Sequence, residues 1–110
     1  MSNKKKVILI IGGNLESLHG IKIAKAKNYI TVVADGNFNA PAKKFADYFI
    51  NTSIYDSEGT VKKVSILNKK IKIDAVMSLS TDVPLTVSKV AKKLNLNSIP
   101  IKAAKIFSNK

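Results

Sequence analysis

The fold is indicated first by residues 4–20, which read KKKVILIIGGNLESLHG. Five apolar residues, Val7 to Ile11, predict a buried strand, and Gly12 and Gly13 predict a tight turn directly after it. A strand, a glycine turn and a helix in this order are typical of the first unit of a nucleotide-binding α/β sheet. The pattern leaves open whether the glycine pair contacts a ligand or only turns the chain.

Three nearly continuous apolar runs rich in valine and isoleucine predict buried strands, and a shorter run predicts a fourth. The long runs are Lys6–Ile11, Tyr29–Ala34 and Asp74–Leu79, and the short one is Tyr48–Asn51. Continuous apolar runs are expected where helices cover both faces of a parallel sheet. An extended piece at Ser98–Pro100 would add a fifth strand.

Apolar residues at spacings of three and four predict three amphipathic helices between these strands. Their apolar stripes are Leu15, Leu18, Ile21 and Ala24; Val61, Val64, Leu67 and Ile71; and Val83, Val87, Val90, Ala91 and Leu94. Thr81 and Asp82 are candidate caps of the third helix, and Pro84 suits its first turn. Shorter helices are predicted over Pro41–Asp47 and Ile101–Phe107.

The predicted elements alternate along the chain between strand and helix. Alternation of this kind implies right-handed crossovers and an open parallel sheet. With 110 residues, no internal repeat and no biased linker, the chain is expected to form a single domain over residues 1–110. The predicted fold class is therefore α/β, a three-layer Rossmann-like domain with an open parallel sheet of four to five strands.

The net charge of +12 comes from lysine alone, because all 19 basic residues are lysines. Base-edge readout and bidentate phosphate contacts rely on arginine, and the lysines are spread over predicted helix faces and ends. A solvated lysine-rich surface is therefore favoured over a specific nucleic-acid interface. The chain has no cysteine and no apolar run long enough to span a bilayer, so we expect a cytoplasmic protein without a membrane partner.

Polar turn residues follow the predicted strands at their carboxyl ends, where open parallel sheets collect ligands. These candidates for a small-molecule ligand edge are Gly12, Gly13 and Asn14; Asp35, Gly36 and Asn37; and Ser80, Thr81 and Asp82. Each of these residue types also has an ordinary role in turns. The candidates therefore predict where a ligand would bind, but they do not indicate which ligand or which reaction.

The first turn matches only part of the dinucleotide-binding fingerprint, G-x-G-x-x-G. Counting from Gly12, the second and third glycine places hold Asn14 and Ser17, and Glu16 would repel a pyrophosphate. Asp35 lies about twenty residues on, where a ribose-binding acid is expected, although Asp-Gly is also a common turn pair. A stand-alone nucleotide or dinucleotide module that uses Asp35 is therefore an alternative function, and a basic nucleic-acid module is a weaker one.

The sequence offers few groups for catalysis or metal binding. His19 is the only histidine, and most of the seven acidic residues are isolated from one another. A histidine-based triad and a two-metal phosphoryl-transfer site both need more such groups. Asp56–Gly59 reads as a loop leading into a capped helix, without the alternating oxygen ligands of a calcium loop. We therefore predict no catalytic residue and no metal site in this chain.

Several segments, in order along the chain, resemble the N-terminal domain of ATP-grasp ligases. Lys5–Gly13 resembles the family's first strand and glycine pair, and Gly20–Tyr29 resembles its helix that ends near an aromatic residue. Val32–Pro41, VVADGNFNAP, resembles the second strand with its acid and the N-x-x-A-P turn. Ala46–Asn51, ADYFIN, resembles the entry to the third strand.

Later segments extend the resemblance over essentially the whole chain. Ile73–Val76 followed by Ser80–Asp82 resembles the fourth strand and its ligand-edge loop. Ala103–Lys110 resembles the segment that leads, through an N-K step, into the ATP-binding lobes. One departure is Asn14, since many relatives carry a third glycine there.

The resemblance implies a preATP-grasp domain, the Rossmann-like N-terminal unit of biotin carboxylase, carbamoyl-phosphate synthase large chains and related carboxylate–amine ligases. These enzymes use ATP and Mg²⁺ to form an acyl phosphate, which an amine or another nucleophile attacks. Their nucleotide and metal residues lie in later lobes. The chain alone is therefore expected to be inactive and to be the N-terminal part of a longer enzyme, working with downstream lobes of the same polypeptide. A homodimer of the full-length enzyme is compatible with the resemblance.

Overall fold

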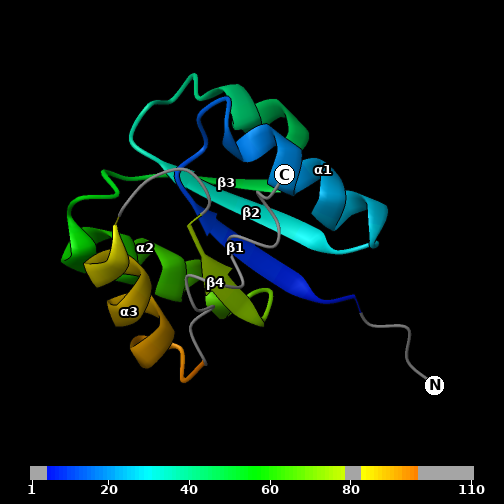
Figure 1. Cartoon of the computed structure of the whole chain (residues 1–110). Coiled ribbons are helices and arrows are strands. Elements are labelled where there is room, and N and C mark those ends of the chain that lie inside the picture. The colour runs from blue at the N-terminus through cyan, green and yellow to red at the C-terminus, as the bar shows by residue number, and fades with distance from the viewer. Residues whose placement is uncertain (1–4, 79–82, 97–110) are drawn as a thin grey trace.

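A computed structural model describes residues 5–78 and 83–96 of the chain (Figure 1). Four strands form one parallel sheet in the order β3-β2-β1-β4. They are β1 Val7–Ile11, β2 Ile30–Asp35, β3 Tyr48–Asn51 and β4 Ala75–Met77. The chain steps outward from β1 to β3 and then crosses to the far side of β1, so the strand order reverses between β1 and β4. The four predicted strands and their parallel pairing are confirmed.

Helices cover both faces of the sheet. They are α1 Ser17–Ala26, the 3-10 helix η1 Pro41–Phe45, α2 Ser57–Asn68 and α3 Pro84–Lys93. The first two lie on one face and α2 and α3 on the other (Figure 1). The predicted α/β, three-layer Rossmann-like architecture is therefore confirmed.

The central strand β1 is buried along its whole length, which explains its unbroken apolar sequence. Its side chains alternate between the two helical layers, as in any strand. Leu9 and Ile11 belong to the core cluster shared with α2 and α3, whereas Ile8 and Ile10 belong to the cluster shared with Ile21 of α1. The sheet thus supports two separate cores from one short apolar run.

Two asparagines end helices in the left-handed conformation. Asn28 has a φ of 66° after α1, and Asn95 has a φ of 60° after α3. Past the first of these, the Tyr29 N–H donates to the carbonyl of Ala24 at 3.0 Å, which satisfies a group left over at the helix end. Asparagine tolerates positive φ better than most residues, so it ends both helices at little cost.

The prediction for the start of the first helix is wrong. The helix α1 begins at Ser17, and Leu15 lies in the turn before it with 70% of its surface exposed, outside the apolar stripe. The cause is local: the Oδ1 atom of Asn14 accepts the N–H of Glu16 at 3.1 Å, which holds these residues in a turn instead of a helix.

The helix predicted over Pro41–Asp47 is instead the shorter 3-10 helix η1, which ends at Phe45. Ala46 already has extended backbone angles, and the N–H of Asp47 donates to the carbonyl of Thr31 at 3.0 Å. Pairing with β2 therefore pulls the chain into β3 before a full α-helical turn forms.

Other predictions fall outside the described residues. These are the cap at Thr81 and Asp82, the end of the fourth strand at Leu79, the strand at Ser98–Pro100 and the helix at Ile101–Phe107. Where α3 begins, the cap position is held by Val83, which makes no side-chain capping bond, and Pro84 occupies the first helical turn as predicted.

Candidate functional site

The parallel sheet brings the segments that follow its strands to one side, here called the carboxyl edge. Its described parts are residues 12–16, 36–40, 52–56 and 83–86. The first two parts adjoin, because β1 and β2 are neighbours and Ile11 pairs with Ala34 at their ends. The candidates Gly12, Gly13 and Asn14 are therefore brought next to Asp35, Gly36 and Asn37. The candidates Ser80, Thr81 and Asp82 lie outside the described residues.

The carboxylate of Asp35 joins the two adjoining loops. Its Oδ2 atom accepts the N–H of Gly13 at 2.7 Å, and its Oδ1 atom accepts the N–H of Asn37 at 2.8 Å. The first bond crosses from β2 to the turn after β1, and the second closes the turn around Gly36. The acid at the end of β2 thus holds the glycine turn in place.

The two glycines of this turn are needed for different reasons. Gly12 has a φ of 98°, a conformation that other residues rarely adopt. A Cβ atom on Gly13 would lie 2.7 Å from Cγ1 of Val33 and 3.4 Å from Cβ of Ala42. The first glycine therefore permits the turn, and the second lets the backbone pack closely against β2 and η1.

The start of α1 is hydrogen-bonded from within the turn. The Oγ atom of Ser17 donates to the carbonyl of Gly12 at 2.8 Å, and the N–H of Ser17 donates to the carbonyl of Asn14 at 3.0 Å. Ser17 is fully buried and was missed as a site residue. The sequence did hold a sign of this role. Ser17 stands where the dinucleotide-binding fingerprint, counted from Gly12, has its third glycine, and only a small residue fits where the helix approaches the strand.

Asn51, at the end of β3, completes the edge and was also missed. Its Nδ2 atom donates to the carbonyls of Asp35 and Gly36 at 3.0 and 3.2 Å. The carbonyl of Asn51 in turn accepts the ammonium of Lys63 at 2.7 Å. Only the register of β2 and β3, which pairs Asp35 with Asn51, creates this contact, and no local sequence pattern contains it.

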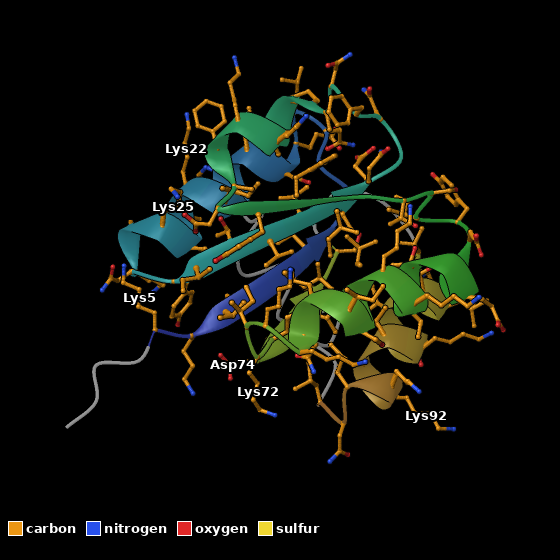
Figure 2. All side chains as sticks on the ribbon, turned by 180° about the vertical axis from the view of Figure 1, so that it is seen from behind. Lys5, Lys22, Lys25, Lys72, Asp74 and Lys92 are labelled. Carbon is orange, nitrogen blue, oxygen red and sulfur yellow. The ribbon has the colours of Figure 1, made fainter. Side chains whose placement is uncertain are left out.

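Most of the acidic side chains among the described residues lie on the side of the sheet where the strands end. Four of the six acids among the described residues lie at or after the end of a strand. Asp35 is the last residue of β2, Glu16 follows β1, and Asp56 and Glu58 follow β3. Lys5 and Lys72 lie instead near the starts of the strands, where Asp74 also lies (Figure 2). Two lysines moderate the acidic edge, since Lys89 pairs with Glu58 at 3.6 Å and Lys63 binds the end of β3.

Asp47 lies on the side of the sheet where the strands begin and holds the start of β3 against β2. Burial would raise the pKa of its carboxyl, but hydrogen bonds and a nearby cation outweigh burial and lower the pKa below 3.8. The stabilising partners are the N–H of Thr31 at 2.8 Å and the ammonium of Lys25 at 3.4 Å. This carboxylate has a structural role away from the candidate site.

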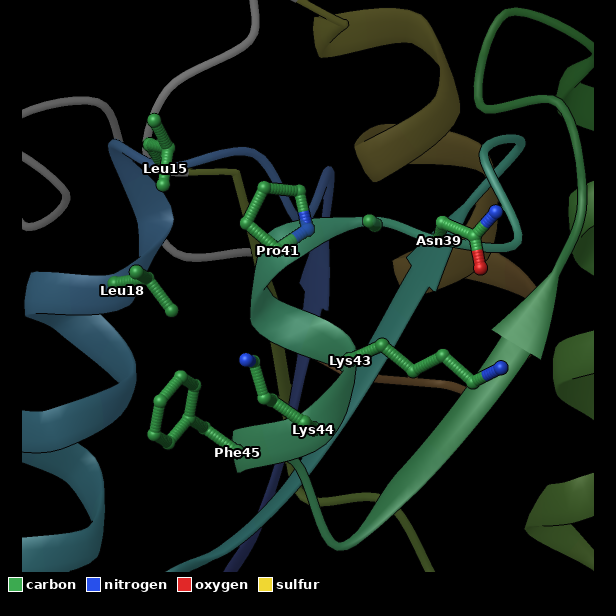
Figure 3. Close-up of a pocket in the computed structure, with 8 residues that line it drawn as sticks. Leu15, Leu18, Asn39, Pro41, Lys43, Lys44 and Phe45 are labelled. Carbon is green, nitrogen blue, oxygen red and sulfur yellow. The ribbon is translucent and has the colours of Figure 1, made fainter.

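A groove of about 600 Å³ adjoins the carboxyl edge between α1 and η1 (Figure 3). Leu15, Leu18, Pro41 and Phe45 give it apolar walls. Lys43 extends from η1 away from α1 (Figure 3), and its ammonium lies 3.1 Å from the ring centre of Phe38, as in a cation–π contact. The groove is therefore an apolar extension of the edge on the side of α1.

In residues 5–78 and 83–96, no three histidine, cysteine or acidic side chains are grouped in a way that could hold a metal ion. His19 is exposed on α1. No helix in the same part of the chain has the length and apolar character needed to cross a membrane.

Solved structures with the same arrangement of elements cover most of this chain. A phosphoribosylglycinamide synthetase from Anaerococcus prevotii superposes with a TM-score of 0.72 and 24% identity, over 86% of this chain and 23% of that one. An N5-carboxyaminoimidazole synthetase from Staphylococcus aureus complexed with ADP gives 0.68 and 20%, over 98% and 27%. An L-amino acid ligase from Bacillus licheniformis gives 0.64 and 22%, over 94% and 27%. The chain has the Rossmann-like fold found in these ATP-grasp ligases.

The resemblance to ATP-grasp ligases is thereby confirmed at the level of fold. The chain spans about a quarter of the length of these ligases. A more distant structure, ElxO with NADP bound, superposes with a TM-score of 0.57 and 17% identity over 82% of this chain and 49% of that one. No protein-family model and no curated protein sequence matches the chain.

Proposed function

We propose that this chain is the N-terminal, substrate-side domain of an ATP-dependent carboxylate–amine ligase of the ATP-grasp type. In this proposal its carboxyl edge closes over a reaction centre carried by further lobes of the polypeptide, which bind ATP and Mg²⁺. The chain supplies a wall of the substrate site and no catalytic group. The shared fold and the quarter-length match to larger ligases support this role.

The observation that carries the proposal is the placement of exposed apolar side chains. Each described segment that follows a strand exposes one large hydrophobic residue at the carboxyl edge: Leu15 after β1, Phe38 after β2, Tyr55 after β3 and Leu85 after β4. Their exposed fractions are 70%, 60%, 75% and 62%. These are four of the seven large hydrophobic residues that are exposed in the described part of the chain, and a concentration of exposed apolar side chains on one side favours an interaction surface.

The polar groups of the same edge suit a surface that meets a substrate and a second lobe together. The backbone of both glycine-containing turns is fixed by Asp35 and Asn51, so these loops are preorganised. Because a rigid loop loses little entropy on binding, it is a suitable wall for a site that another lobe completes. The role assigned to Asp35 here is positioning, because its carboxylate accepts the backbone N–H groups of Gly13 and Asn37.

The test measures ATP turnover by two proteins. One is the 110-residue chain, and the other is the longer polypeptide that includes this chain and whatever its reading frame encodes beyond Lys110. We expect ADP release, dependent on an acid and an amine, from the longer polypeptide and none from the chain alone. ADP release by the purified chain would contradict the proposal, as would a reading frame that ends at Lys110 with no separate ATP-grasp protein that activates it.

A further inference from the structure

Three backbone N–H groups of the first turn, of the kind that an open α/β sheet offers to a phosphate, are bonded to partners within this chain. At the first turn, the N–H of Gly13 donates to Asp35 at 2.7 Å and the N–H of Glu16 donates to Asn14 at 3.1 Å. The next amide, that of Ser17, donates to a carbonyl of the same turn at 3.0 Å. A phosphate at this turn needs such N–H groups, because they and the helix dipole provide the attraction.

The charges at the turn also oppose a phosphate. The N–H of Gly13 is bound to the carboxylate of Asp35. A phosphate bound to the same N–H would therefore lie next to this carboxylate, and the two negative charges would repel each other. Glu16 adds a second negative charge directly before α1. A nearby cation on the neighbouring segment, Lys43, is directed away from α1 and onto the Phe38 and Phe49 rings, at 3.1 and 5.2 Å (Figure 3).

We infer that the first turn of the carboxyl edge excludes phosphate groups, and that Asp35 and Asn14 are the residues that set this specificity. The inference rests on the proposed function in one respect: it assigns to the ligase an acceptor that carries no phosphate, such as an amino acid or a simple amine. Whatever the function of the chain, the inference also excludes the binding of a dinucleotide or a phosphorylated sugar at Gly12 and Gly13.

The experiment follows the backbone amide signals of the ¹⁵N-labelled chain by NMR during titration with inorganic phosphate and with ADP, at constant ionic strength. In the wild-type chain the signals of Gly13 and Glu16 should not shift in a saturable way. Asp35→Ser removes the carboxylate and frees the N–H of Gly13, and Asn14→Gly frees the N–H of Glu16. In each variant the signal of the freed amide should shift in a saturable way, with half-saturation at a phosphate concentration at least about tenfold below the highest one that leaves the wild-type signals unshifted.

Asp56→Ser is the matched control, because it removes one negative charge from the neighbouring loop while serine can still cap α2. It should leave phosphate binding at the turn unchanged. Saturable binding of phosphate to the wild-type turn would overturn the inference, as would failure of both Asp35→Ser and Asn14→Gly to improve binding. If Asp35→Ser does not fold, Asn14→Gly alone decides between these outcomes.

The acceptor class is tested separately in the longer polypeptide by comparing ADP release with amino acids and with phosphorylated amines. Release that requires a phosphorylated acceptor would overturn the inference and leave the ligase role intact. Absence of ADP release with every acceptor would count against the ligase role, while the NMR titration would still decide whether the turn excludes phosphate.

Discussion

Gly13→Ala tests the close packing of the glycine turn against β2. The added Cβ atom would lie 2.7 Å from Cγ1 of Val33, a separation that real Cβ contacts essentially never show, and Val33 is fully buried. Because β2 is fixed on both sides by β1 and β3, neither partner can move away freely. Overpacking of this kind destabilises by about 1–3 kcal/mol.

The double variant Gly13→Ala/Val33→Ala separates this clash from other effects of the substitution. Val33→Ala alone should cost roughly 2 kcal/mol through lost burial and a small cavity. In the double variant the clash disappears, so its free energy of unfolding should exceed the additive expectation by at least about 1 kcal/mol. Urea denaturation of the four proteins gives this coupling energy. Simple additivity would refute the packing argument.

Three further substitutions test other contacts by urea denaturation. Asp47→Asn should destabilise by less than about 1 kcal/mol at neutral pH, and the difference should shrink as pH falls below 3.8, because the lowered pKa of Asp47 stabilises the fold only while the carboxyl is ionised. Asp56→Ala should cost about 1 kcal/mol, since its carboxylate accepts the N–H of Gly59 at the start of α2, and Asp56→Ser should cost little. Thr86→Val should cost about 1–3 kcal/mol because its buried hydroxyl donates to the carbonyl of Ile54 at 2.6 Å, while Thr86→Ser keeps that donor.

The sequence predicted the layers of the fold well because burial on both faces leaves an unbroken apolar run in each central strand. The five residues of β1 show this most clearly, since all are buried between two helical layers. The spacing of Val87, Val90 and Ala91 likewise predicted the buried face of α3. Such patterns depend only on which residues face the core.

The contacts of the site were harder to predict, because they depend on register and on competition between local bonds. The bond from Gly13 to Asp35 exists because β1 and β2 pair in one register, and the sequence contains no sign of that register. Leu15 fitted a helical stripe, yet the side chain of Asn14 holds a turn there. The sequence therefore located the carboxyl edge without specifying which atoms of that edge are already bonded.

In the proposed function, the carboxyl edge is the surface on which further lobes of the polypeptide close. Hydrogen–deuterium exchange of the 110-residue chain, compared with the longer polypeptide, measures this directly. We expect slower exchange in the longer polypeptide at residues 13–16, 36–39, 52–56 and 83–86, and unchanged exchange at 27–29 and 69–73 on the opposite side of the sheet. Protection confined to the opposite side, or equal exchange at the carboxyl edge in both proteins, would contradict it.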